Sequence, residues 1–515
     1  MIDFATAAAR FGLGARPDDI RPTDVRAALR AQFDRFKARP AAFASAPSRA
    51  VVAGTLAEYL EETRDYRQQA GMAGGNAAAA KAMRAETQAM DASGAPTGET
   101  VQQVLRASRK FVGQVPRDQY LALVGARMNA ALVTETPFVE RLVHFWANHF
   151  AISIDKLPVI GLGGLLEVEA IRPHVLGKFA DMLLAVERHP AMLLYLDQAQ
   201  SIGPDIQVGR AFAARGRRQV GLNENLAREV MELHTLGART GYSQADVTEF
   251  ARAMTGWTTA GITRGPMVRT LGIGGPPGDF VFAPAIHQPG ERQIMGRRYA
   301  EGSADQAERI MRDLAAHPAT ATHIATKLAR HFACDVPPKP LIDRLAMRFT
   351  ATGGDLPALY RVLIEAPELA QPKLAKFKTP WDWSVATLRA VGTRQVEGQA
   401  IAGLLTQLGQ PVWRPGSPAG FDDMDATWAG PDALIRRVEA AARIATRGGG
   451  SGADPRRLAA TVLPAGGSPA TLAAIARAES PVEGIALMLV APEMMRRYWQ
   501  CSICRSAVAA CSSPD

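Results

Sequence analysis

The stretch from Asn223 to Gly237, NENLAREVMELHTLG, constrains the fold more than any other part of the chain. It sets many polar side chains into a short, otherwise apolar segment with helical periodicity. On a helical wheel of about 100° per residue, Glu229 falls on the apolar face beside Leu233. A carboxylate in such a place is costly unless it is paired or hydrogen-bonded. We therefore expect Glu229 to meet a partner, for which His149, Arg141, another arginine and a metal are the alternatives.

The same wheel divides the other polar residues of this segment. Asn225 and Glu232 flank the apolar face on the side of the glutamate, whereas His234 lies on its opposite edge. Arg228 faces away and is expected to pair with a carboxylate across a helix contact. Asn223 is expected to cap the helix at its N-terminus. A glycine closes the segment, as is common at helix C-termini.

A second apolar helix is predicted over residues 138–150. Trp146 lies on its apolar face together with several phenylalanines, and His149 falls in the middle of that face. Asn148 and His144 lie off the face, and we expect His144 to point to water or to a partner. An inward histidine is more often a satisfied core residue than a ligand, so both interpretations of His149 stay open.

The remaining pattern predicts a mainly α protein, a multi-helix globular bundle with a small antiparallel β insertion around residues 266–299. Aromatic residues make up only 6% of the chain while Ala and Leu abound, which favours helix over strand. Glycine and proline cluster at 272–279 between β-prone pieces, with His287 expected at the turn of the insertion. Before the insertion, Ser243 and Asp246 form the pattern of a capping box.

Three regions are expected along the chain. Residues 1–130 form an N-terminal helical region with long polar helices, and residues 131–395 form a central helical core that carries the motif helices and the insertion. Residues 396–515 form a C-terminal helical cap with a flexible linker near 448–455. A loose tail follows, with Cys501, Cys504 and Cys511, where no second cysteine pair exists to complete a zinc site.

The formal net charge of +9 is spread over dispersed arginines, without a Lys-rich stripe or a nucleic-acid motif. We therefore expect no nucleic-acid partner. No run of about 18 apolar residues is present, so no transmembrane segment is expected. No signal peptide is recognisable, which makes a cytoplasmic location the default. A periplasmic location through an exported partner stays open.

Several motifs in fixed order resemble the bacterial domain of unknown function 1800 family, and the resemblance covers most of the chain. The residues that carry it are Phe145-Trp146-Ala147-Asn148-His149-Phe150, Asn223 to Glu229, Glu232 to Gly237, Gly241-Tyr242-Ser243, Asp246-Val247, Thr255-Gly256-Trp257, His287 with Gly290, and Lys378-Thr379-Pro380. The chain departs from the family pattern at Gln288, where Asp is usual, at Arg292, where Lys is usual, and at Gly420-Phe421-Asp422, where Gly-Trp-Pro is typical. These departures put a role for the 287–292 turn and the 420 loop in doubt.

The resemblance implies a mostly helical bacterial protein without an established reaction. It also implies a protein partner, because members are often encoded beside a second family similar to the sulfatase and alkaline-phosphatase superfamily. Members of that second family commonly carry export signals.

Two functions stay open at this stage. In the first, the chain is a hydrolase-like enzyme whose carboxylates and imidazoles converge in one apolar pocket, where their pKa values suit acid–base work. The expected catalytic residues are His149, Glu229, Glu232, His234 and His287. The expected binding residues are Trp146, Asn148, Asn223, Asn225, Arg228, Trp257 and Lys378.

In the second, the same residues form a buried structural network in a non-catalytic assembly or binding partner. The cofactor is unknown, and a divalent metal is an open alternative. HExxH and Glu-x-x-His are absent around the motif, so a metal needs His149 or His287 from other elements. No Gly-x-Ser-x-Gly elbow supports nucleophilic catalysis.

Overall fold

The computed structural model describes residues 4–69, 113–207, 209–210, 221–263, 273–370, 374–448 and 454–498. The core of the expected linker, the cysteines of the tail and the first part of the expected β insertion lie outside these residues. Within them the prediction of a mainly helical fold is confirmed, with three small two-stranded antiparallel sheets. None of the described helices combines the length and hydropathy that a membrane crossing requires.

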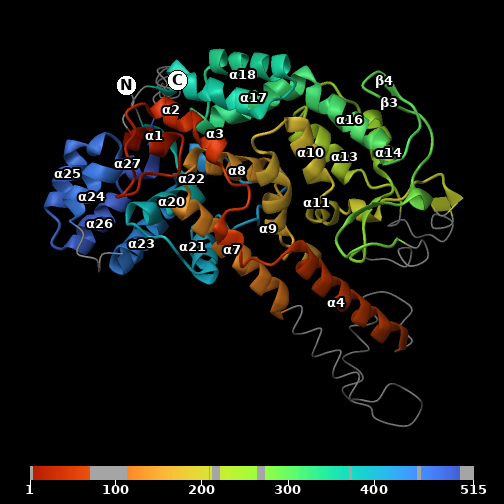
Figure 1. Ribbon diagram of the computed structural model, residues 1–515, viewed down its shortest axis with the longest axis horizontal. Coiled ribbons are helices and arrows are strands. Elements are labelled where there is room, and N and C mark those ends of the chain that lie inside the picture. Colours follow the sequence, from red (N-terminus) through yellow and green to blue (C-terminus); the bar gives the residue numbers. More distant parts are fainter. Residues whose placement is uncertain are drawn as a thin grey trace, which may run out of the picture.

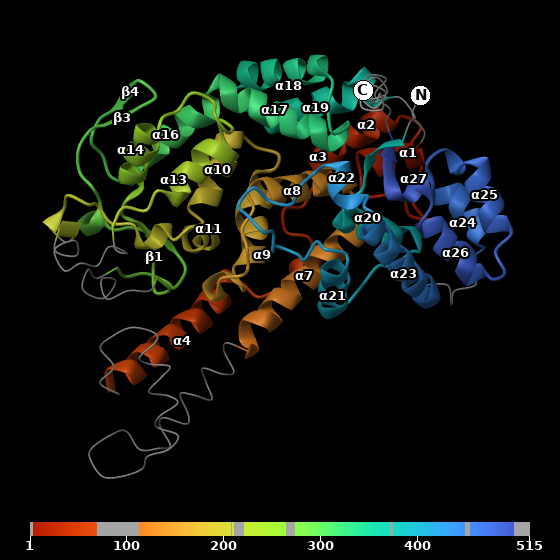
Figure 2. The same ribbon diagram turned by 180° about the vertical axis from the view of Figure 1, so that it is seen from behind.

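The long helix α7 (Val115–Val133) and the helix α8 (Pro137–His149) run through the centre of the molecule (Figure 1). A proline opens α8, where its fixed φ and missing N–H are tolerated. Almost every side chain of α8 is buried, its polar ones included, so this helix is covered on all sides. α4 (Arg49–Gln69) projects from the body beside the start of α7 (Figure 2).

One half of the molecule packs around the antiparallel pair α17 (Pro318–Phe332) and α18 (Lys339–Thr352). α19 (Leu356–Glu365) packs on α18, and α16 (Ala304–Ala316) packs on both α17 and α10 (Phe179–Glu187). The central core joins these helices to α8 through aromatic contacts, such as the edge-on contact of Phe138 with Phe332.

The other half has its own hydrophobic core, built from α20 (Pro380–Ala390), α23 (Pro431–Gly448) and the C-terminal helices. α1 (Phe4–Arg10) contributes to this core although it begins the chain. α21 (Gly398–Gln407) packs on α7, and β5 (Leu374–Phe377) pairs with β6 (Arg496–Tyr498). These contacts join regions that the sequence divides near residues 130 and 395.

The remaining helices are α2 (Val25–Arg30), α3 (Gln32–Arg35), α9 (Gly163–Leu166), α11 (Pro190–Tyr195), α13 (Asn225–Glu229), α14 (Gln244–Met254), α22 (Asp425–Trp428), α24 (Pro455–Val462), α25 (Pro469–Ala476), α26 (Pro481–Leu489) and α27 (Pro492–Met495).

The β insertion consists of two separate strand pairs. β1 (Trp257–Thr259) pairs with β2 (Phe280–Phe282), and β3 (Arg292–Ile294) pairs with β4 (Arg297–Tyr299). The tight turn lies at Met295 and Gly296, which both have positive φ, and not at His287 as expected. A two-residue hairpin turn that matches the twist of its strands needs such φ values, so the turn forms there.

The motif segment is not a regular α-helix throughout. α13 continues into a π-helical turn over Val230–His234. Such a turn takes in an additional residue, so the side chains that follow are rotated away from the positions on an α-helical wheel. His234, expected at the edge of the apolar face, is therefore fully buried, while Leu233, expected on the face, is only half-buried.

Candidate functional site

A cavity of about 440 Å³ lies between α8, α17, the start of α20 and the loop 410–423. Its size is in the range of small-molecule sites. The polar and charged residues that line it are Arg127, His144, Asn148, His149, His323, Lys327, Arg330, His331, Thr379, Asp382, Gln410, Asp422 and Asp423. Aromatic and aliphatic side chains line the rest, so the cavity combines an apolar wall with titratable groups.

α17 supplies three of these groups from a single face. His323, Lys327 and His331 are spaced four residues apart, which sets them one above another along the helix. None of these three residues was among the candidate site residues expected from the sequence. The signal was present as a His-x3-Lys-x3-His spacing.

Two histidines satisfy the carbonyl groups at the end of the π-helical turn. The Nε2 of His149 lies 3.2 Å from the carbonyl oxygen of His234, and that of His323 lies 3.1 Å from the carbonyl oxygen of Leu233. Helix ends leave such carbonyls without intrahelical partners, so each ring N–H donates to one. The Nδ1 of His149 then carries a lone pair and is buried without a partner in the described part of the chain. Gly237 (φ +92°) leaves room for His323, whose Nδ1 lies 3.0 Å from the position of a Cβ.

Lys327 is the cation on this wall that lacks a defined partner. Among the described residues, its ammonium group forms neither a hydrogen bond nor an ion pair. Burial lowers the pKa of Lys327 to about 8, although the charge of Asp423 opposes this effect. Burial also lowers the pKa of His323 to about 4 and that of His149 well below its usual range. Near neutral pH the cavity therefore holds neutral imidazoles beside an amine close to its titration point.

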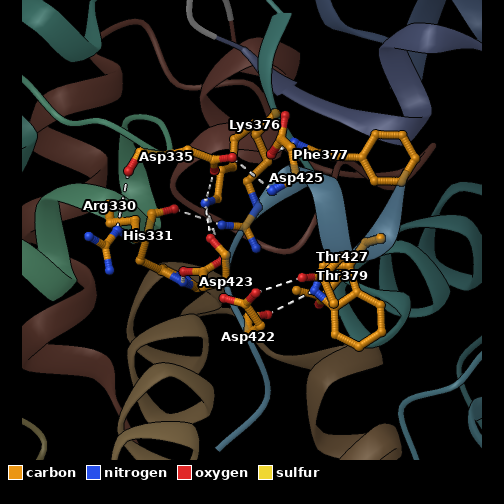
Figure 3. Close-up of polar contacts among 12 residues, drawn as sticks. Arg330, His331, Asp335, Lys376, Phe377, Thr379, Asp422, Asp423, Asp425 and Thr427 are labelled. Atoms are coloured by element: carbon orange, nitrogen blue, oxygen red, sulfur yellow. Dashed lines mark hydrogen bonds and ion pairs between the residues drawn. The ribbon is translucent and has the colours of Figure 1, made fainter. Parts of the chain in front are cut away.

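His331 is held at both ring nitrogens, and Figure 3 shows it beside Asp423. Its Nδ1 donates to Asp423 at 2.8 Å, and its Nε2 accepts from the Nε of Arg141 at 3.2 Å. Burial lowers the pKa of His331 to about 3. Burial alone would raise the pKa of Asp423, but the interaction with His331 and the charge of Lys376 hold it below its usual range. This pair is thus fixed in place and has no ring nitrogen left for a proton transfer.

Asn148 fastens the loop 410–423 onto α8. Its Nδ2 donates to the carbonyl oxygen of Phe421 and its Oδ1 accepts from the N–H of the same residue, both at 2.8 Å. Gly420 has φ +83°, and a Cβ there would lie only 2.3 Å from the carbonyl oxygen of Asn148. The loop whose role the family departures put in doubt therefore forms one wall of the cavity.

The opposite wall is aromatic. The guanidinium group of Arg127 lies 4.0 Å from the ring centre of Trp381 and 5.4 Å from that of Trp413. Its Nε is 2.7 Å from the carboxylate of Glu167, a fully buried pair. The indole N–H of Trp381 donates to the Nδ1 of His144 at 3.0 Å. His144 is thus buried in the cavity wall, contrary to the expectation that it faces water or a partner.

Of the five expected catalytic residues, only His149 lines the cavity. Glu229 is half-buried on α13, and no hydrogen bond or ion pair to it is formed within the described residues, so His149 is not its partner. Burial raises the pKa of Glu229. Glu232, also half-buried, accepts a hydrogen bond from the hydroxyl of Tyr242 at 3.3 Å.

The two remaining histidines also lie outside the cavity lining. His234 is fully buried, with its Nδ1 2.7 Å from Glu187. His287 is buried in the β insertion, with its Nδ1 2.8 Å from the carbonyl oxygen of Thr255. The expected convergence fails here because His287 is tied to the end of α14, whose packing directs it to the hairpins.

Among the expected binding residues, Asn148 is the one that lines the cavity. Trp146 is fully buried and donates from its indole N–H to the hydroxyl of Tyr360 at 2.7 Å. Trp257 is fully buried in β1. Lys378 donates to a backbone carbonyl oxygen of α27 at 2.8 Å, and burial lowers its pKa to about 7.

The other three binding residues organise the motif segment itself. The side chain of Asn223 accepts from the N–H of Asn225 at 2.9 Å, but the N-cap of α13 is Glu224, so Asn223 is not the capping residue that was expected. Asn225 is exposed. Arg228 pairs with Glu224 of the preceding turn at 3.2 Å and reaches across to Gln244 of α14 at 2.8 Å. The helix-crossing contact is thus made to an amide, whereas the carboxylate comes from the same segment.

A metal centre is not evident from the side chains. Within the described ranges, no group of three or more His, Cys, Asp or Glu residues is arranged to hold a metal ion. The arrangement instead offers proton donors and acceptors around a cavity.

The comparisons with curated proteins and with solved structures give no match. A family model, described as a protein of unknown function (DUF1800), matches residues 6–496 and therefore nearly the whole chain. The chain belongs to this DUF1800 family.

Proposed function

We propose that this protein is a hydrolase-like enzyme that performs general acid–base chemistry on a small polar substrate in the cavity of α8 and α17. One observation carries the proposal: the half-buried ammonium group of Lys327, which has no hydrogen-bond or ion-pair partner among the described residues, shares a cavity wall with the unpartnered Nδ1 of His149. Polar atoms that are buried without partners cost stability, and they persist where a ligand uses them.

The roles follow from the protonation states. Lys327, with a pKa of about 8, is able to donate a proton and to take it back near neutral pH. His149 is neutral, and its Nδ1 is directed to accept a hydrogen bond from a substrate hydroxyl or from the attacking water. His331 and Arg141 act as positioning residues because they hold each other and the loop that closes the cavity.

The second candidate is the non-catalytic one, and a specific observation favours it. Next to the cavity, Arg172 forms a bidentate ion pair with Glu140 at 2.7 Å, in addition to the pair of Arg127 with Glu167. Such a network is sufficient to specify packing without any reaction. Under this proposal the chain assembles with a partner similar to the sulfatase and alkaline-phosphatase superfamily, in the cytoplasm or beside an exported partner.

An activity screen separates the two candidates. The purified chain is tested at pH 8 with chromogenic carboxyl esters, phosphate esters, sulfate esters, glycosides and peptide amides. We expect hydrolysis of one class, lost by at least about 100-fold in Lys327→Met and in His149→Asn. Glu232→Gln is the control because this residue lies outside the cavity lining. Turnover that both cavity variants retain, or no turnover by the unmodified chain, contradicts the enzyme.

A further inference from the structure

Two neighbouring cations face the cavity from α17. Lys327 and Arg330 are three residues apart, on one side of the helix, and both line the cavity. Arg330 donates from its Nε to the carbonyl oxygen of Asp335 at 3.2 Å, a neutral acceptor (Figure 3). Within the described residues, neither cation forms an ion pair with a carboxylate.

The three carboxylates of the cavity are engaged elsewhere. Asp423 interacts with His331 and Lys376, as described above. Asp382 pairs with a buried arginine of β6 and accepts from the hydroxyl of Thr379. Asp422 accepts a hydrogen bond of 2.6 Å from Thr427. The charge of Asp423 acts on Lys327 from a distance, but none of the three carboxylates forms a direct ion pair with either α17 cation within the described residues.

We propose that the cavity binds the oxyanion of its substrate, a carboxylate or a phosphate group, between Lys327 and Arg330, with a hydrogen-bond donor of the same molecule at the Nδ1 of His149. Adjacent like charges repel, and an anion between them converts this repulsion into two charge-assisted hydrogen bonds. The unpartnered acceptor on the buried His149 side chain supplies the second, independent contact. The substrate class is therefore a small molecule with one oxyanion and one hydroxyl or amine.

This inference rests on the proposed function only in that both use the same cavity. The two fail separately. Anion binding without hydrolysis of any substrate class contradicts the enzyme and keeps the oxyanion site. Hydrolysis that depends on Lys327, with anion affinity unchanged in Arg330→Gln, supports the enzyme and contradicts the oxyanion site.

The test is isothermal titration of the full-length chain at pH 7 with sodium acetate and, separately, with inorganic phosphate. We expect the unmodified chain to bind at least one of them, and Arg330→Gln to weaken that binding by about tenfold or more. Tighter binding of phosphate identifies a phosphoryl group, and tighter binding of acetate identifies a carboxylate. Arg330→Lys keeps the charge and is expected to restore most of the affinity.

The matched control is Arg348→Gln, since Arg348 is an exposed arginine on the neighbouring α18 and lies outside the cavity lining. It removes the same charge from the molecule, so a general effect of net charge lowers affinity equally in both variants. Equal loss in the two glutamine variants, or no binding of either anion by the unmodified chain, overturns the proposal. A melting temperature of Arg330→Gln close to that of the control shows that the loss does not come from unfolding.

Discussion

The cavity wall and the motif segment Asn223–His234 contain similar side chains, yet they use them differently. In the motif segment, His234 is held by Glu187, Glu232 by Tyr242, and Arg228 by Glu224 and Gln244. On the cavity wall, the ammonium group of Lys327 and the Nδ1 of His149 have no such contacts within the described residues. The polar richness of the sequence therefore did not locate the candidate site. Within the described residues, Glu229 and the Nε2 of His234 also lack hydrogen-bond partners, so the cavity wall differs in that its unpartnered groups face a cavity.

The physical reason is the cost of burial. A buried polar group that is paired adds to stability or leaves it unchanged, so it requires no ligand. A buried group without a partner destabilises the fold, and its retention indicates another use. Four predictions test this distinction, beginning with the largest expected effect.

Neutralising one member of a partnered pair is expected to cost most. Glu140→Gln leaves the charge of Arg172 buried without its bidentate partner, so we expect a loss of about 3–5 kcal/mol in the free energy of unfolding. Guanidinium denaturation measures it. Asp343→Asn is the control, because it breaks an exposed pair with Lys339 that contributes roughly 0–1 kcal/mol. Similar losses in both variants would refute the contrast between buried and exposed partners.

Acid is expected to destabilise the protein through the cavity histidines. The folded-state pKa of His323 is lowered to about 4, whereas an unfolded histidine titrates near 6.5. Between these values the unfolded state binds more protons, so stability is present above pH 6.5 and is lost as the pH falls toward 4. Each such histidine adds a slope of up to about 1.4 kcal/mol per pH unit.

Urea denaturation at pH 6.5, 5.5 and 4.5 measures this slope. His323→Gln is expected to make it shallower by roughly 1 kcal/mol per pH unit, because glutamine does not titrate in this range. An unchanged slope in the variant means that His323 titrates alike in both states.

Asn148→Ala tests the attachment of the cavity loop. It removes two hydrogen bonds to Phe421, and we expect a loss of about 2 kcal/mol. Hydrogen exchange of the amide of Phe421 should accelerate, since that N–H loses its acceptor. Asn225→Ala, at an exposed position of the motif segment, is expected to change stability by less than about 0.5 kcal/mol.

Lys327→Met has the smallest expected effect on stability and the opposite sign. It replaces a half-buried cation, which has no partner among the described residues, by an apolar side chain of similar length, so we expect a gain of about 1 kcal/mol. Lys339→Met, at an exposed site of α18, is the control and should leave the melting temperature nearly unchanged. A loss of stability in Lys327→Met would place this lysine with the partnered structural residues.

Local features could be predicted because they depend on neighbours in sequence. The helical class follows from composition and period, and the expected capping box of Ser243 and Asp246 is present at the start of α14. Gly237 adopts the positive φ expected after a helix, and His149 points inward as its wheel position predicts. Each of these depends on the chemistry of a few consecutive residues.

Tertiary structure decided where the polar groups of the chain meet. The π-helical turn rotates His234 into the core, and donors from α8 and α17 satisfy the carbonyl groups at its end. The cavity beside His323, Lys327 and His331 forms only when the loop 410–423 packs against the helices. Asn148 holds that loop by a hydrogen bond to Phe421, which is 273 positions away in the sequence. A local pattern specifies which face of a helix is polar. Whether the polar side chains on that face find hydrogen-bond partners depends on elements distant in sequence. The cavity is therefore a property of the folded chain.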